Sequence, residues 1–312
     1  MDNADNNDTA LARLAELYPV DASEQRLRCF GHIINLVVQG LLFGKGISAF
    51  QKKLAAADDA LSYQLWREQG AIGKLHNLIV YICRSGKRQL VFNTIQQDAA
   101  DDLLVFCLKL KRDTGVRWNS TYTMVERALH LEPVLSLYCA RWQKAKDDTY
   151  NLKLDELDVQ DWEELRHFKQ LLKPFFKATK RVEGFARQGS YGALWEVLPG
   201  FDYLFNALQR AQDEVNKNRE LFSDYYASCL DVGFTKLQQY YNLTDHSRLY
   251  RAAVALHPAK RFAWFEQQWS QNTGGLKDVA NAKIAVKKLW HDFIAEQPPL
   301  TIAPPFPPSR SS

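Results

Sequence analysis

Apolar positions along the chain recur mainly at the spacing of an α-helix. After a polar start, Leu11, Leu14 and Tyr18 repeat every three or four residues, and a proline follows, which predicts a first helix. Asn7 or Asp8 is expected to cap its first turn.

The hydrophobic pattern changes in the next two segments, first to alternation and then back to helical spacing. The stretch "RLRCF", residues 26–30, is short and alternates between polar and apolar positions, which predicts a strand. The stretch "HIINLVVQGLLF" that follows carries its apolar residues on one helical face. Residues 1–45 therefore predict helix, strand and helix, which is a fragment of an α/β unit and not a complete one.

Beyond residue 45 the pattern is helical, so the fold class is expected to be mainly α. Helices are predicted over 50–68, 70–82, 94–110, 162–176, 194–208, 219–241 and 276–294, with two short helices in 248–269 that are separated near Pro258. Ser120 or Thr123 is expected to cap a helix that follows the Arg117-Trp118 pair.

We divide the chain into three parts from these patterns. Residues 1–45 form the incomplete α/β unit, 46–296 a large helical domain with a lobe boundary near 143–160, and 297–312 a Pro-rich tail expected to be disordered. No repeat of fixed period is found.

Composition and charge narrow the class of protein. Apolar residues make up 46% and charged residues 24%, which is ordinary for a globular chain. The net charge of +4 permits a nucleic-acid partner without requiring one. The five cysteines are odd in number and widely spaced, which favours a reducing, intracellular location. No secretory signal is recognised, and no apolar run is expected to reach the length needed to span a bilayer.

Two groups of residues have spacings that suggest metal binding. Cys29-x-x-His32 resembles half of a zinc site, but His76 and Cys83 are poorly spaced to complete it. The alternative is that Cys29 ends a buried strand and His32 caps or packs on the next helix. Asp2, Asp5 and Asp8 recur every three residues, which suits either a hard cation or an acidic helix N-terminus.

The pair Arg117-Trp118 follows the basic residues Lys109, Lys111 and Arg112. An indole can stack on an unpaired base, and cationic side chains can hold the neighbouring phosphates. The alternative is an indole packed in the core beneath the Arg side chain. No P-loop, nucleophile elbow or dinucleotide-binding motif is present in the sequence.

Four segments, in this order, resemble motifs of the hAT-superfamily transposases common in fungal genomes. They are "DNADNNDTALARL", "RLRCFGHIINLVV", "GVRWNSTYTMVERAL" and "YRAAVALHPAKRFAWF", and "GSYGALWEVLPGFDYLFNAL" fits the region between the last two. His257 stands where the family usually has Asp.

The resemblance implies an RNase H-like core that is interrupted by a helical insertion. Residues 1–45 would then be a partial RNase H-like core and residues 46–296 the helical insertion domain. Three carboxylates in such a core hold two Mg²⁺ or Mn²⁺ ions for DNA cleavage and transfer. Asp2 matches one of them, as a catalytic and metal-binding residue. The resemblance places Cys29 and His32 near DNA at the cleavage point. It places Arg117, Trp118 and Asn119 in the insertion, where the Trp supports a flipped DNA end.

The same resemblance gives expectations for partners. DNA is the expected partner, as transposon ends in hairpin or single-stranded form, in the nucleus and with self-association. No membrane and no small-molecule substrate are expected. The family's zinc finger of the BED type, its first core strands, two of its carboxylates and its C-terminal dimerisation segment have no counterpart here. We therefore expect a fragment that binds DNA ends, is inactive alone and holds no metal; the alternative is a host-adopted helical module for DNA or protein binding.

Overall fold

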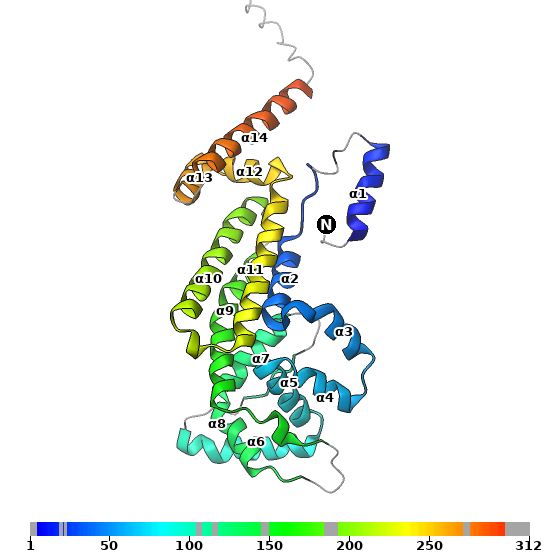
Figure 1. The fold of residues 1–312 in the computed structure, drawn as a ribbon, viewed down its shortest axis with the longest axis vertical. Coiled ribbons are helices and arrows are strands. Elements are labelled where there is room, and N and C mark those ends of the chain that lie inside the picture. Colours follow the sequence, from blue (N-terminus) through cyan, green and yellow to red (C-terminus); the bar gives the residue numbers. More distant parts are fainter. Residues whose placement is uncertain are drawn as a thin grey trace, which may run out of the picture.

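The structure is a computed structural model that describes residues 5–18, 21, 24–103, 108–113, 118–144, 150–183, 193–270 and 275–296. Over these residues it is mainly α-helical and contains no strand, so the predicted fold class is confirmed. Figure 1 shows an elongated stack of helices, with α1 and α14 at one end and α6 and α8 at the other.

The helices follow one another with short connections. Their bounds are α1 (Asp5–Leu17), α2 (Phe30–Phe43), α3 (Ile47–Ala55), α4 (Asp59–Arg67), α5 (Gly70–Cys83), α6 (Gly86–Leu103), α7 (Trp118–His130), α8 (Glu132–Arg141), α9 (Val159–Glu183), α10 (Val197–Lys217), α11 (Asp224–Thr244), α12 (Arg248–Ala255), α13 (Arg261–Trp269) and α14 (Gly275–Glu296). Short 3₁₀ turns occur at η1 (Gly44–Gly46), η2 (Leu152–Asp155), η4 (Leu194–Glu196) and η5 (Arg219–Leu221).

Helix α2 lies near the middle of the stack, packed against α9 and α11 (Figure 1). Ile34, Val38 and Leu41 are fully buried there. The crossing with α11 is tight because Gly233 has no side chain: a Cβ at that position would lie 2.1 Å from the Cδ2 of Leu41. The segment predicted to belong to a separate core thus shares one hydrophobic core with the helices after residue 45.

The apolar character of α2 has a second consequence. Phe30–Ala55 is long and apolar enough to cross a membrane by length and composition, so the expectation that no run reaches this length is not met. Half of its 18-residue window is buried inside the structure, and the turn η1 interrupts it. Burial by neighbouring helices is the physical reason for this composition, because the residues of α2 that pack against α9 and α11 lie in the hydrophobic core.

In the lower half of the molecule, a buried carboxylate from the predicted boundary region 143–160 connects η2 to α4 and α5. Asp155 is fully buried and accepts two hydrogen bonds from the guanidinium of Arg67, at 3.0 and 2.8 Å. Asn77 and Tyr150 donate to the same carboxylate. A bidentate ion pair with all oxygens satisfied fixes η2 against α4 and α5. The three-part division of the chain stays a prediction.

The strand predicted over residues 26–30 is not formed. Residues 26–29 are irregular, and α2 begins at Phe30. No strand occurs in the described chain to pair with this segment, so no ladder can form. Instead, the backbone N–H of Arg28 donates to the hydroxyl of Tyr250 at 2.8 Å, and Arg26 contacts Asp8 of α1 at 2.6 Å.

Several predicted helix boundaries are also wrong. The helix predicted over 50–68 is two helices, because Asp58 caps α4 by accepting a hydrogen bond from the N–H of Leu61. Ser120 and Thr123 lie inside α7, which begins at Trp118, so neither is its cap. The helix predicted over 94–110 ends at Leu103, and residues 108–113 are not helical. The two short helices around Pro258 are confirmed as α12 and α13. The predicted tail, 297–312, lies outside the described residues.

Candidate nucleic-acid interface

The predicted catalytic and metal residue Asp2 lies outside the described residues, as does Arg117. Of the other N-terminal carboxylates, Asp8 pairs with Arg26, and Arg28 approaches the same oxygen to 3.7 Å. In the part of the chain that is described, no group of three or more His, Cys, Asp or Glu side chains could hold a metal ion. The catalytic and metal-binding role of Asp2 stays a prediction.

Trp118 packs in the hydrophobic core at the start of α7. Its side chain is only 6% exposed, and its ring lies edge-on to Tyr122 and to Phe176 of α9. Its neighbour Asn119 is half-buried and donates to Glu183 at the end of α9 at 3.5 Å. The indole face is not open to a base in this conformation, and the stacking role of Trp118 stays a prediction.

The basic residues before α7 are exposed on an anchored segment, residues 108–113. At one end, the side chain of Gln96 makes two hydrogen bonds to the backbone of Leu108. At the other end, the buried carboxylate of Asp113 accepts hydrogen bonds from the hydroxyls of Ser120 and Thr121. The side chains between these anchors that reach solvent are Lys109, Lys111 and Arg112.

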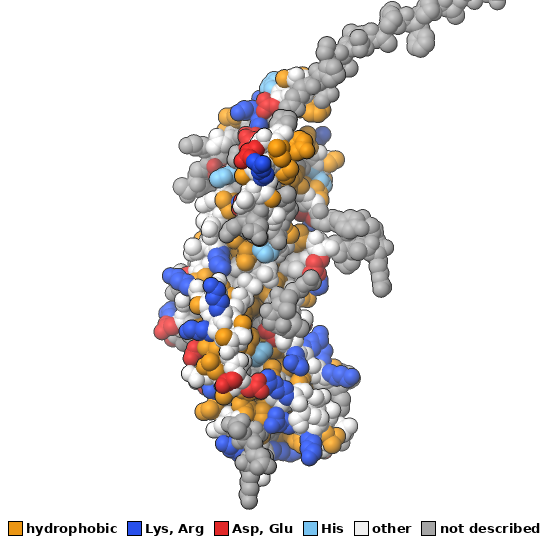
Figure 2. Space-filling model, turned by 90° about the vertical axis from the view of Figure 1, so that its right-hand side faces the viewer, with side chains coloured by type: hydrophobic (Ala, Val, Ile, Leu, Met, Phe, Trp, Pro, Cys, Tyr) orange, Lys and Arg blue, Asp and Glu red, His pale blue; other side chains and the backbone are white. Residues whose placement is uncertain are grey.

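Asp113 also lines a small hollow with Gln51 and Leu54 of α3, so the segment lies beside that helix. Helix α3 itself carries the exposed Lys52 and Lys53. Figure 2 shows Lys and Arg side chains gathered over the lower half of the face that it presents. Residues 108–113 therefore offer a cationic surface that suits phosphate contacts but has no exposed aromatic ring among its members.

Cys29 and His32 lie at the start of α2, with Cys29 exposed and His32 half-buried. The residues that were weighed as a second zinc pair do not join them. The ring of His76 stacks on Trp66 with centroids 3.7 Å apart, and burial lowers its pKa to about 4. Burial raises the pKa of the Cys83 thiol. An imidazole and a thiol kept neutral by burial are typical of core residues.

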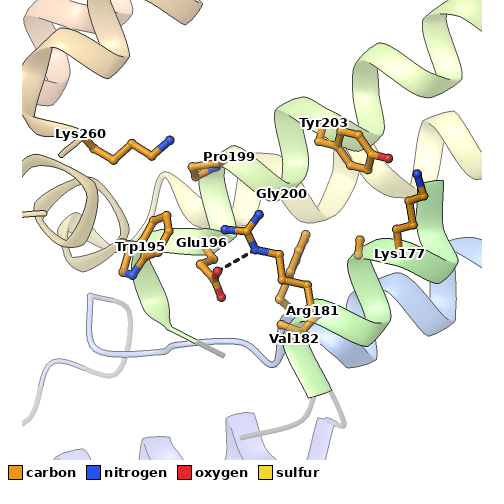
Figure 3. Close-up of a pocket in the computed structure, with 11 residues that line it drawn as sticks. Lys177, Arg181, Val182, Trp195, Glu196, Pro199, Gly200, Tyr203 and Lys260 are labelled. Atoms are coloured by element: carbon orange, nitrogen blue, oxygen red, sulfur yellow. Dashed lines mark hydrogen bonds and ion pairs between the residues drawn. The ribbon is translucent and has the colours of Figure 1, made fainter. Parts of the chain in front are cut away.

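Phe30, which lies between Cys29 and His32 in the sequence, lines a cavity that the sequence did not predict. This basic cavity, of about 340 Å³, lies where α2, the end of α9, the start of α10 and the turn before α13 meet. Lys177, Arg181 and Lys260 border it, and Figure 3 shows Trp195 at one end and Tyr203 at the other.

The cations of the basic cavity are placed by specific contacts. Arg181 pairs with Glu196 at 2.7 Å, and its guanidinium lies 5.8 Å from the ring centroid of Trp195. The ammonium of Lys260 lies 5.9 Å from the same centroid. Glu196 neutralises part of the charge, but the side chain of Arg181 remains 67% exposed. The cavity therefore combines an aromatic wall with an excess of positive charge.

The floor of the basic cavity depends on a glycine. The ring of Phe30 packs on Phe201 with centroids 5.0 Å apart and approaches Gly200 closely. A Cβ on Gly200 would lie 2.5 Å from the Cε1 of Phe30. The absence of a side chain at residue 200 thus lets α2 and α10 meet below the cavity.

Segments that are far apart in the sequence converge on this cavity. Phe30 belongs to the "RLRCFGHIINLVV" segment, Trp195 and Tyr203 to "GSYGALWEVLPGFDYLFNAL", and Lys260 to "YRAAVALHPAKRFAWF". His257, the residue that departs from the family pattern, lies with its ring centroid 4.2 Å from that of Trp195. The segment "GVRWNSTYTMVERAL" contacts the same end of α9 through Trp118 and Asn119.

A weak signal for the cavity was present in the sequence. Lys177 and Arg181 are four residues apart and therefore lie on one face of a helix. Nothing in the sequence indicates that Trp195 and Lys260 lie opposite that face, because both belong to other elements.

Comparisons with known proteins place part of this chain in context. Residues 27–170, somewhat less than half of the chain, match the family described as the ZBED1 RNase-like helical domain. Over 280 residues, 86% of this chain, the sequence is 24% identical to the protein tpeD of Talaromyces stipitatus, which is named as a proposed transcriptional regulator. The chain spans 28% of the length of that protein. No solved structure matches.

Proposed function

We propose that this chain is a transposase-derived helical module that binds DNA, with the basic cavity as a principal contact. The observation that carries the proposal is the placement of Lys177, Arg181 and Lys260 around the rings of Trp195 and Tyr203. The match of residues 27–170 to the RNase-like helical domain supports a transposase-derived origin.

The chemistry of the cavity suits a distorted DNA end. Cationic side chains bind phosphate oxygens and release condensed counterions, which makes the affinity depend on salt. Aromatic rings offer stacking surfaces to bases that have left the helix. A duplex end or hairpin supplies both groups at short distance, whereas an intact duplex presents phosphates without accessible base faces.

The setting that we propose for this activity is the nucleus. The name of the Talaromyces relative supports a regulatory role for a protein of this kind, and the mildly basic charge of this chain is compatible with it. The described cavity residues support DNA binding, and the proposal does not extend to DNA cleavage. More specifically, we propose that the chain descends from an hAT transposase and that Asp2 corresponds to one of the metal-binding carboxylates of that family.

A protein-interaction role has one observation in its favour. Trp290, Phe293 and Ile294 on the last turns of α14 are each at least half exposed. Exposed apolar side chains that are contiguous on one helix often mark a contact surface. This role is compatible with DNA binding, because α14 lies apart from the cavity residues on α9 and α10 (Figure 1).

The test is a salt titration of binding to a labelled hairpin, measured by fluorescence anisotropy. Replacing Lys177 by Ala should weaken binding several-fold and lower the slope of log K against log salt by about 0.7–0.9, the share of one phosphate contact. The matched control is Lys173→Ala, one turn earlier on α9, exposed and outside the cavity lining.

Two outcomes would contradict the proposal. One is the absence of salt-dependent binding to any DNA. The other is an equal loss in the Lys177 and Lys173 variants, which would mean that the overall charge of α9 matters and the cavity does not. Circular dichroism of each variant checks that the helices remain folded.

A further inference from the structure

We infer that the basic cavity is one end of a groove between α9 and α10 that binds single-stranded nucleic acid. This inference rests on the proposed function and specifies its ligand and path. It is based on a second hollow of about 360 Å³ further along the same two helices. Tyr203 lines both hollows, so the two are neighbours that share this residue.

The second hollow has an aromatic and amide lining. It includes His167, Gln170 and Pro174 of α9, Arg210 of α10 and Phe222 before α11. The rings of His167 and Phe222 have centroids 4.4 Å apart, and Phe222 stacks on Tyr226 at 5.3 Å. Ala207 and Ala211 of α10 also line it, and their small side chains keep the groove open.

The dimensions favour a single strand over a duplex. Each hollow has the volume of a small-ligand site, which accommodates one or two nucleotides and not a double helix. The ring of Tyr203 is 41% exposed between the two hollows, where it can stack on a base only if that base is unpaired.

Charge is distributed unevenly along the groove. The end at the C-terminus of α9 carries Lys177, Arg181 and Lys260 against Glu196. At the far end Arg210 is balanced by Glu214. Phosphates should therefore be held most strongly in the basic cavity, and the far end should contribute through stacking.

Pro174 leaves one backbone carbonyl at the far end of the groove without its usual helical hydrogen-bond donor. Because proline has no N–H, it cannot donate the helical hydrogen bond to the carbonyl oxygen of Gln170, four residues earlier. Both residues line the second hollow. A carbonyl that is released from the helix in this way can accept a hydrogen bond from the amino group of a base.

The length of the groove sets the length of the ligand. From His167 to Arg181 the axis of α9 extends ~21 Å at 1.5 Å per residue. A stacked strand with ~3.4 Å per nucleotide would place about six nucleotides along it. Oligonucleotides shorter and longer than this length should thus differ in affinity.

The experiment compares oligo-dT of about four and about ten nucleotides, and a blunt duplex of equal length, by fluorescence anisotropy with the full chain. The ten-nucleotide strand should bind at least several-fold more tightly than either of the others. Tyr203→Ala should weaken its binding by roughly 5- to 150-fold, which corresponds to the loss of one base–aromatic stack. Tyr18→Ala is the matched control, because Tyr18 is 61% exposed and lies outside the lining of both hollows.

The outcomes separate this inference from the proposed function. Equal binding of both strand lengths, unaffected by Tyr203→Ala but weakened by Lys177→Ala, would overturn the groove and leave the basic cavity as a DNA site. A preference for the blunt duplex would do the same. No binding of any of these DNAs, or of the hairpin, would overturn both.

Discussion

Two tryptophans of this protein lie next to basic residues, and their surroundings are opposite. Trp118 follows a run of Lys and Arg in the sequence, yet its ring is buried against Tyr122 and Phe176. Trp195 has no basic residue beside it in the sequence, yet its half-buried ring has Arg181 and Lys260 within 6 Å.

The difference shows how a stacking site is assembled. Residue types that suit nucleic-acid binding have to meet in space with one ring face accessible. Around Trp118, the cations of residues 108–113 point to solvent while the indole fills the core. Around Trp195, cations from α9 and from the turn before α13 converge on one ring.

The largest expected effect is on stability, and it separates the two tryptophans. Trp118→Ala should lower the free energy of unfolding by ~3–5 kcal/mol, the usual cost of removing a buried aromatic side chain. Trp195→Ala should cost much less, because its ring is half-buried, but should weaken DNA binding several-fold. Chemical denaturation of both variants measures the free energy of unfolding, and fluorescence anisotropy measures their affinity for DNA.

The comparison would fail if Trp118→Ala left stability unchanged and abolished binding. That result would mean that the indole leaves the core when DNA binds, as its predicted stacking role requires.

A smaller effect concerns the pH dependence of stability, since α10 and α5 each contain a buried group whose pKa is displaced. Burial raises the pKa of Asp202 in α10 from 3.8 to about 6, with Tyr241 and Trp269 beside it. Burial lowers the pKa of His76 in α5 from 6.5 to about 4, with Arg112, Asp113, Arg84 and Asp155 nearby.

The two groups act in opposite directions. Between about pH 4 and 6 the folded state binds more protons at Asp202 than the unfolded state does, so its contribution to stability falls as the pH rises. The unfolded state binds more protons at His76 between about pH 4 and 6.5, so that contribution rises with pH. Displacements of this size are worth at most ~3 kcal/mol each.

Asp202→Asn should therefore make stability rise more steeply between pH 4 and 6, as measured by urea denaturation at several pH values. His76→Gln should make it rise less steeply or fall. An unchanged slope in the Asp202 variant would show that its carboxyl is not titrating in this window.

The smallest expected effect is on binding through the exposed basic segment. Replacing Lys109, Lys111 and Arg112 together by Ala should weaken DNA binding only a few-fold and uniformly across sequences, as expected for rim phosphate contacts. Stability should hardly change, because all three side chains are exposed. A loss as large as that of the Lys177 variant would move the main binding surface to residues 108–113.

The helices were predictable wherever a periodic apolar face was long. The helix after residue 32 was found from its apolar spacing, and the pair around Pro258 was found from the helix-breaking proline. One failure involves residues whose neighbours are distant in the sequence, and another involves a local helix cap. Residues 26–29 have strand-like alternation, but Tyr250 and Asp8 are their neighbours instead of another strand. Helix α3 ends and α4 begins where Asp58 provides a cap, which the apolar pattern of 50–68 concealed.

The sequence by itself determined that this protein is mainly helical, mildly basic and similar to transposases in several short segments, because periodicity and motifs are local properties of a chain. The tertiary structure decided which of those segments meet. It buried Trp118, brought Phe30, Trp195 and Lys260 to the end of α9, and placed Tyr203 in the lining of two neighbouring hollows. Contacts between residues so far apart follow from how the helices pack around α2, and that packing depends on side-chain shapes, such as the missing Cβ at Gly200 and Gly233, that no local pattern records.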